Sequence, residues 1–167
     1  MLKRVTSHRT FTSYIDRTRH YYAAQGYEQP YQWARNDEVP FAKLSKPLSG
    51  SRLTLITTSG PWSVQDKEVL RGKREVWSGS TSEPPEKLFT DHLSWDKENT
   101  HTEDVGSFLP ITRIREYVEQ GRLGSIAPRY HGVPTDYSQQ ATREKDAPQI
   151  LERCLEDGVD IALLVPL

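Results

Sequence analysis

The stretch Val159-Asp-Ile-Ala-Leu-Leu-Val165 is a nearly continuous apolar run near the end of the 167-residue chain. A strand that is apolar on both faces is typical of a parallel sheet with helices on both sides. Directly upstream, a helical stripe predicts a helix that Asp146 caps and Gly158 ends. The stripe consists of Ile150, Leu151, Cys154 and Leu155. The sequence therefore predicts a helix that leads into a buried parallel strand.

Earlier segments repeat this alternation of strands and helices. The pattern predicts strands over about 53–58, 74–78 and 124–131, and a helix that starts at Pro110 and stops before Gly121. We expect the strands at 53–58, 126–131 and 160–165 to lie in one largely parallel sheet. The predicted fold class is α/β, an open, largely parallel sheet flanked by helices, similar to half of a Rossmann fold.

The first 50 residues have a different character. Aromatic residues at helical spacing predict a helix over about 12–25, with Gly26 as its stop. An irregular arm follows, rich in proline (Pro30, Pro40, Pro47) and in aromatic residues (Tyr27, Tyr31, Trp33, Phe41). We expect residues 1–50 to pack on a core formed by residues 51–167, the α/β domain.

Composition limits the classes of function. A net charge of -1 and a pI of about 6.5 provide no basic surface for nucleic acid or an anionic membrane. No apolar run reaches the roughly 20 residues of a membrane helix, and no secretory signal precedes the first helix. The single cysteine, Cys154, excludes an internal disulfide and is expected to be an inert core residue. Together these features favour a cytoplasmic protein.

Two polar groups are candidate site residues. The first group consists of His101, Glu103 and Asp104. It indicates either a proton-handling or metal-binding loop, or a solvated loop that caps the 110–120 helix. The spacing typical of metal ligands is absent from this group. The second group, around a Gly-Val-Pro turn after a predicted strand, consists of Arg129, His131 and Asp136. His131 is either an acid or base at the strand end or an exposed histidine. His101, Arg129 and Asp136 are the substrate-binding candidates, and His131 and Asp104 the catalytic ones.

A series of short motifs runs through most of the chain in a fixed order. In the C-terminal half they are Asp104, SFLPI (107–111), Arg113, Glu116, GRLGS (121–125), PRYHG (128–132), Asp146-Ala147 and GVDIALLVP (158–166). The N-terminal half adds Tyr21-Tyr22, Gly26-Tyr27, PYQWA (30–34), VPF (39–41) and KPL (46–48). In the order and spacing of these motifs the chain resembles the selenoprotein B family of glycine/sarcosine/betaine reductases.

The resemblance implies a redox motif, selenocysteine-x-x-cysteine, immediately after Leu167, with a helix behind it. Because UGA encodes selenocysteine and is otherwise read as a stop, it also implies a reading frame ended at that codon. The expected function is then the N-terminal portion of a selenium- or thiol-dependent reductase that acts on a small amine or amino-acid-like substrate. Its implied partners are a pyruvoyl-type reductase subunit and a thiol reductant, and no cofactor is expected besides the selenocysteine.

A second reading remains open. In it the chain is a non-catalytic α/β interaction domain that ends naturally at Leu167. This domain would bind a partner through its aromatic arm. In the first reading, the apolar strand 160–165 without a following helix favours a homo-oligomer built around that strand or the aromatic arm.

Overall fold

The structure, a computed structural model, describes residues 11–27, 29, 35, 37–40, 42–61, 75–90, 98–135 and 138–167. The chain divides into two compact units, residues 1–40 and 41–167. Each unit is described by itself, and the expected packing of the N-terminal segment on the core stays a prediction. Among the described residues, no helix is long and apolar enough to cross a membrane.

The first unit contains helix α1 (Tyr14–Ala24). The helix begins after Ser13, whose hydroxyl accepts a hydrogen bond from the Asp16 N–H at 3.3 Å. Gly26, with a φ of 86°, adopts the left-handed conformation that stops it. The helix predicted over 12–25 is therefore confirmed. Tyr31, Trp33 and Phe41 of the expected arm lie outside the described residues.

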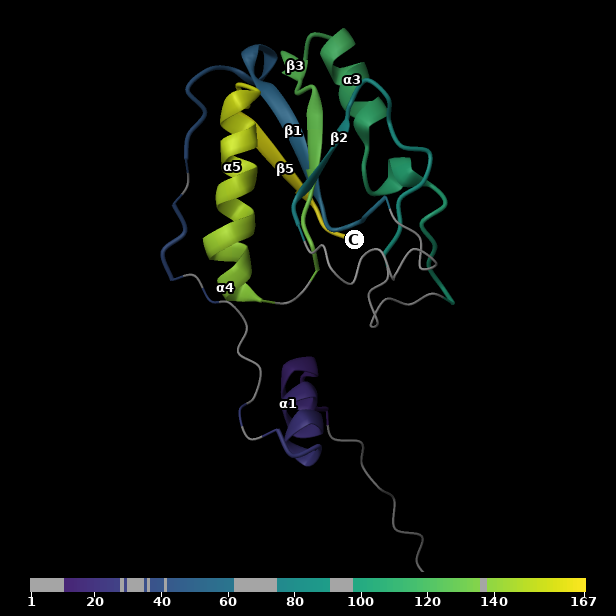
Figure 1. The fold of residues 1–167 in the computed structure, drawn as a ribbon, viewed down its shortest axis with the longest axis vertical. Coiled ribbons are helices and arrows are strands. Elements are labelled where there is room, and N and C mark those ends of the chain that lie inside the picture. Colours follow the sequence, from purple (N-terminus) through teal and green to yellow (C-terminus); the bar gives the residue numbers. More distant parts are fainter. Residues whose placement is uncertain are drawn as a thin grey trace, which may run out of the picture. The chain divides into compact units, whose positions relative to one another are not determined.

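The second unit is built on a mixed sheet around strand β1 (Arg52–Thr57) (Figure 1). On one side, β1 is parallel to β3 (Ser125–Ile126) and β4 (Arg129–Gly132); on the other side it is parallel to β5 (Ile161–Val165). Strand β2 (Trp77–Ser80) pairs antiparallel with β4. The fold is thus α/β with an open sheet, and the predicted parallel arrangement of the three main strands is confirmed.

Two predicted strands have different bounds in the structure. The strand expected over 124–131 is divided into β3 and β4 at Ala127 and Pro128. Proline has no N–H to donate to a ladder, so pairing is interrupted there. The short strand expected at 74–78 lies at 77–80.

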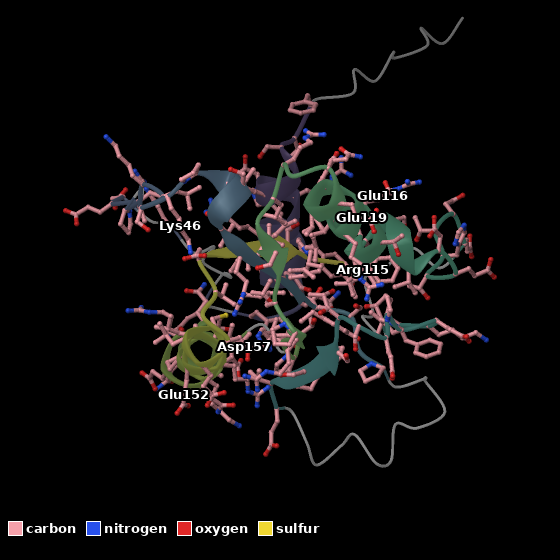
Figure 2. All side chains as sticks on the ribbon, turned by 90° about the horizontal axis from the view of Figure 1, so that it is seen from above. Lys46, Arg115, Glu116, Glu119, Glu152 and Asp157 are labelled. Atoms are coloured by element: carbon pink, nitrogen blue, oxygen red, sulfur yellow. The ribbon has the colours of Figure 1, made fainter. Side chains whose placement is uncertain are left out.

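Helices cover both faces of the sheet. Helix α3 (Ile111–Glu119) lies on one face, where a core cluster includes Leu53 and Leu55 of β1. The helix α5 (Ala147–Glu156) lies on the other face, where Ile56 packs with Ile150 and Cys154. Figure 2 shows the two helices on opposite sides of the sheet, with Glu116 labelled on α3 and Glu152 on α5. The alternation of side chains along β1 therefore produces two separate cores.

Two short 3₁₀ turns, Leu48–Gly50 and Val105–Ser107, precede β1 and α3.

The prediction that Asp146 caps the last helix was wrong. The helix begins earlier, with α4 (Gln139–Ala141), and the Ser138 hydroxyl accepts a hydrogen bond from the Ala141 N–H at 3.1 Å. A π-helical turn, Thr142–Asp146, then leads directly into α5. Pro148 explains the wide turn, because it has no N–H for the carbonyl four residues earlier and its ring crowds that carbonyl. Asp146 is a buried residue within this helix, and its side chain makes no cap hydrogen bond.

The apolar run in β5 is less covered than its sequence predicts. Leu164 is 69 % exposed, and on α5 two leucines of the predicted buried stripe, Leu151 and Leu155, are 59 % and 69 % exposed. Among the described residues, β5 pairs only with β1, so its outer edge is open. Strand β5 is therefore an edge strand, with an apolar surface that continues onto α5.

Candidate functional site

The carboxyl ends of three parallel strands meet at one edge of the sheet. Thr57, the last residue of β1, is in register with Gly132, which ends β4, and with Val165, which ends β5. In open α/β sheets, ligands bind beyond the carboxyl ends of the strands. We call the residues that follow these three strands, 58–60, 133–135 and 166–167, the carboxyl edge. It is the place where the fold favours a site.

Hydroxyl groups line the end of β1. The side chains of Thr57 and Ser59 are fully buried, and their hydroxyl oxygens are 2.9 Å apart, within hydrogen-bond distance. The Ser59 N–H also donates to the Thr57 Oγ1 at 3.1 Å, so the turn after β1 is fixed by its own side chains. Between these two residues, the hydroxyl of Thr58 contacts the backbone of Leu167. The chain after β5 is thereby tied to the end of β1.

His131 lies in β4 on the α5 face, in the row formed with Ile56 of β1 and Leu164 of β5. Its ring is fully buried. Nδ1 is 2.9 Å from the hydroxyl of Ser78, which also accepts a hydrogen bond from the Arg153 guanidinium at 2.9 Å. A serine hydroxyl has two lone pairs and one proton, so Ser78 can accept from Arg153 and still either donate to Nδ1 or accept from it, depending on the tautomer of the ring. Nε2 is buried, and among the residues that the structure describes it has no hydrogen-bond partner.

Electrostatics also favour the neutral form of His131. Burial lowers the pKa of His131, and the positive charges of Arg129 and Arg153 lower it further. Arg153 is held in place by a second hydrogen bond, from Nη2 to the carbonyl of Val76 at 3.2 Å. His131 therefore sits in the carboxyl half of the sheet but inside the core, rather than on a solvent-exposed turn.

Arg129 lies at the opposite, amino end of β4. Its guanidinium binds both carboxylate oxygens of Asp157 at 2.8 Å and one oxygen of Glu156 at 2.8 Å. These hydrogen bonds raise the pKa of Arg129 above its usual value, and the bond to Asp157 has the largest effect. Asp157 is labelled beside α5 in Figure 2. The contacts join β4 to the end of α5.

Another ion pair marks the amino end of β5. The Asp160 carboxylate accepts hydrogen bonds from Lys46 Nζ at 2.8 Å and from the Arg52 N–H at 2.8 Å. The bond to Lys46 is the main cause of the lowered pKa of Asp160. The charged groups at the amino end thus fasten β1, β5 and the segment before β1 together.

The other candidates lie on the exposed segment before α3. Asp104 is exposed, and its carbonyl accepts hydrogen bonds from the N–H and hydroxyl of Ser107. His101 is exposed as well, with Nδ1 3.4 Å from the Glu103 N–H. Asp136 lies outside the described residues. Arg129 and His131 lie two residues apart on the same face of β4, where burial and then the charge of Arg129 lower the pKa of His131. His101 and Asp104 lie on the exposed segment before α3 instead.

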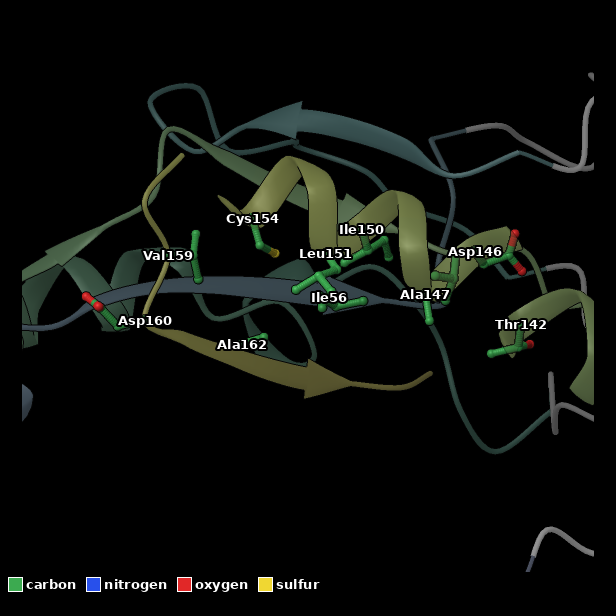
Figure 3. Close-up of a pocket in the computed structure, with 11 residues that line it drawn as sticks. Ile56, Thr142, Asp146, Ala147, Ile150, Leu151, Cys154, Val159, Asp160 and Ala162 are labelled. Atoms are coloured by element: carbon green, nitrogen blue, oxygen red, sulfur yellow. The ribbon is translucent and has the colours of Figure 1, made fainter. Parts of the chain in front are cut away.

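A pocket of about 380 Å³ opens between α5 and the sheet (Figure 3). Ile56 and Ala162 form its floor, and Ile150, Leu151 and Cys154 line it from α5. Burial, followed by the negative charge of Asp157, raises the pKa of the Cys154 thiol. A protonated thiol is a weak nucleophile, so the pocket has the character of an apolar binding surface rather than a thiol site.

Sequence reasoning did not single out the hydroxyls of Thr57, Thr58 and Ser59. A signal was present, since Thr57-Thr58-Ser59-Gly60 stands at the end of a predicted buried strand. Within the described ranges, no group of three or more histidine, cysteine or acidic residues could hold a metal ion. Comparison of the chain with protein-family models, with curated proteins and with solved structures gave no match in any of the three.

Proposed function

We propose that residues 42–167 form the part of a selenium- or thiol-dependent reductase that places a redox residue at the carboxyl end of β5. The proposal follows the resemblance to component B of glycine/sarcosine/betaine reductase. One observation carries it: the backbone of Leu167 is hydrogen-bonded to Thr58 at the carboxyl edge, where α/β folds hold their ligands.

In this proposal a selenocysteine-x-x-cysteine motif follows Leu167, and a selenolate or thiolate there supplies the nucleophile. The residues of the described chain have supporting roles. Thr57 and Ser59 contribute hydroxyls beside the end of β5, and the α/β core holds that end rigid. The substrate class is a small amine or amino-acid-like compound. A pyruvoyl-type subunit and a thiol reductant are the proposed partners.

The test starts from the nucleotide sequence after codon 167. A UGA codon followed in frame by a cysteine codon three positions later supports the proposal; a different stop codon, or no such cysteine, contradicts it. The second step is to express the read-through chain with cysteine at position 168. We expect oxidation to join the two cysteines of the motif, with a loss of 2 Da that a thiol reductant reverses. Serine at position 168 is the control and should abolish the 2 Da change.

A second candidate function has an observation of its own. Leu151, Leu155 and Leu164 are exposed around the apolar pocket beside an open strand edge. Such surfaces favour association. The alternative proposal is a non-catalytic interaction domain that forms a homo-oligomer through β5 and α5.

Sedimentation of the 167-residue chain at high micromolar concentration tests this alternative. We expect a dimer or larger species that L164E converts to a monomer. Tyr117→Ser, which removes an exposed ring from α3, is the matched control and should leave the assembly intact. A strict monomer for the unmodified chain would exclude association through this surface.

A further inference from the structure

Strand β5 has an open edge. Among the described residues it pairs with β1 alone. Edge strands that stay single are commonly protected by charged side chains, by proline or by a bulge. The residues of β5, Ile-Ala-Leu-Leu-Val, include no charged residue and no proline. The sequence of β5 therefore does not oppose pairing with a further strand.

The two faces of β5 differ. Ile161 and Val165 pack against the core cluster on the α3 face, and Leu163, which has the same parity, is exposed on that face. Ala162 and Leu164 lie on the α5 face. Ala162 lines the pocket beneath α5, whereas the larger side chain of Leu164 is 69 % exposed. The α5 face of the strand thus combines a small residue at a pocket with a large residue in solvent.

A second copy of β5 matches these features when the two strands pair antiparallel along their whole length. A two-fold axis then passes through the middle of the pair and brings Leu163 of both copies opposite each other. Ala162 of each copy comes opposite Leu164 of the other. Residues directly opposite in an antiparallel pair lie on one face, with their Cα atoms about 4.5–5.5 Å apart. Each exposed Leu164 side chain therefore lies against the pocket to which the other copy's Ala162 contributes.

Helix α5 extends the same apolar surface. Leu151 lines the pocket together with Ala162, and Figure 3 shows the two residues on α5 and β5, respectively. Leu155 follows Leu151 one helical turn later, and both leucines are exposed. A two-fold axis perpendicular to the sheet keeps the two α5 helices on the same face of the joined sheet. The exposed leucines of the two copies are then on one side of the dimer, where they can pack together.

We infer that two copies of the chain form a dimer with one continuous sheet, in which the β5 strands pair antiparallel with Leu163 at the two-fold axis. Leu164 of each copy covers the pocket beneath α5 of the other copy. The inference rests on the second candidate function, association through β5 and α5, and adds the partner, the symmetry and the register. The partner is a second copy because the protruding Leu164 and the small Ala162 belong to the same strand, so that one two-fold pairing matches both of them twice.

Disulfide cross-linking of the 167-residue chain tests the position of the axis. All variants carry Cys154→Ala, and each receives a single new cysteine before mild oxidation with diamide at high micromolar concentration. A disulfide needs Cα atoms about 4.4–6.8 Å apart. We expect Leu163→Cys to cross-link to its own copy, which doubles the mass on a non-reducing gel until a thiol reductant is added. Thr112→Cys, on the exposed surface of α3, is the matched control and should keep the mass of one chain.

Two further variants distinguish this register from its neighbours. In the proposed pairing, Ala162→Cys and Leu164→Cys each lie diagonally from their own copies, at about 7–8 Å, so neither should cross-link to itself. A mixture of the two variants, one of them carrying an affinity tag, should give the mixed cross-link. Self-cross-linking of Ala162→Cys would move the axis to residue 162, and that of Leu164→Cys would move it to residue 164. Either result overturns the inference, while association through β5 and α5 stands.

Sedimentation separates a failure of the inference from a failure of the candidate function. If the unmodified chain is a strict monomer, association and the proposed dimer both fail. If it is a dimer but none of the β5 cysteines cross-links, the copies meet in another arrangement and the inference alone is overturned. Hydrogen exchange in the unmodified chain provides a second readout, in case a cysteine variant folds poorly. The β5 amides on the open edge should exchange more slowly at high than at low protein concentration, and equal rates would overturn the inference.

Discussion

The indole of Trp77 lies over Gly132 on the neighbouring strand, in the space that a side chain at position 132 would occupy. A Cβ at 132 would approach the ring of Trp77 to 2.0 Å. The two residues are partners in the antiparallel β2–β4 pair, and two residues along the ladder the relation is reversed, with Tyr130 over Gly79. Trp77 and Tyr130 meet edge to face at 5.5 Å. The two glycines therefore make room for an aromatic pair that covers this end of the sheet.

Gly132→Ala should destabilise the protein, because the added methyl group collides with the Trp77 ring. We expect a loss of about 1–3 kcal/mol in the free energy of unfolding, as for other overpacked cores. Urea denaturation followed by tryptophan fluorescence measures it. Gly50→Ala is the control, since a Cβ there meets nothing within 4 Å. Equal stabilities of the two variants would contradict the packing described for Trp77.

Arg129→Lys tests the ion pairs that join β4 to α5. Lysine keeps the charge but cannot make the two parallel bonds to Asp157, whose side chain is only 10 % exposed. The expected loss in unfolding free energy is about 1–2 kcal/mol. Arg113→Lys, in the more exposed pair with Glu116, should cost less. If both substitutions have the same small effect in urea, Arg129 is not a structural anchor.

His131 should make stability depend on pH. An unfolded histidine titrates near pH 6.5, whereas burial lowers the pKa of His131 in the folded protein. Above about pH 6.5 both states are neutral and the contribution is constant. As the pH falls below this value, the unfolded state binds the additional proton, so the free energy of unfolding decreases.

His131→Gln should therefore flatten the dependence of unfolding free energy on pH between 7.5 and 5.5, although the variant is less stable at every pH. His101→Gln, at an exposed position, is the control and should retain the slope of the unmodified chain. Urea midpoints measured at several pH values provide the comparison. An unchanged slope in His131→Gln would show that the ring titrates equally in both states.

Cys154 should react slowly with iodoacetamide in the native protein. Burial raises its pKa and restricts access to the thiol. Each unit of pKa reduces the thiolate fraction about tenfold below the midpoint. Labelling should reach the rate of an ordinary thiol only in denaturant. Leu155→Cys in a Cys154→Ala background places the thiol on the exposed side of α5 and is the fast-reacting control. Equal native rates for the two thiols would contradict the burial of Cys154.

Much of the fold was predictable from local patterns. The apolar runs at 53–58 and 159–165 predicted β1 and β5, and the helical stripe after Pro110 predicted α3. A positive φ occurs at three glycines, each of which directly follows a predicted helix: Gly26, Gly121 and Gly158. Such signals are local: hydrophobic periodicity and the freedom of glycine act within a few residues.

The start of the last helix was not predictable in the same way. Asp146-Ala-Pro148 is a common N-terminal pattern, yet the structure continues the helix upstream to Gln139. The Ser138 hydroxyl supplies the cap in place of Asp146, and the π-helical turn absorbs the missing N–H of Pro148. The exposure of Leu151 and Leu155 was not predictable either, because apolar periodicity identifies a stripe but not the width of the surface that covers it.

For the candidate site, the sequence determined which residue types follow each strand, and it identified His131 as a residue near a strand end. The tertiary structure decided the rest. The parallel register brings Thr57, Gly132 and Val165 to one level, and this follows from pairing between segments more than seventy residues apart. The same pairing buries His131 behind Ser78 and Arg153, and it places Arg129 at the amino end of β4, where its guanidinium binds Asp157. The sequence specifies the type of each side chain. The neighbours that set the pKa of a side chain and its access to solvent are fixed only when distant strands pair.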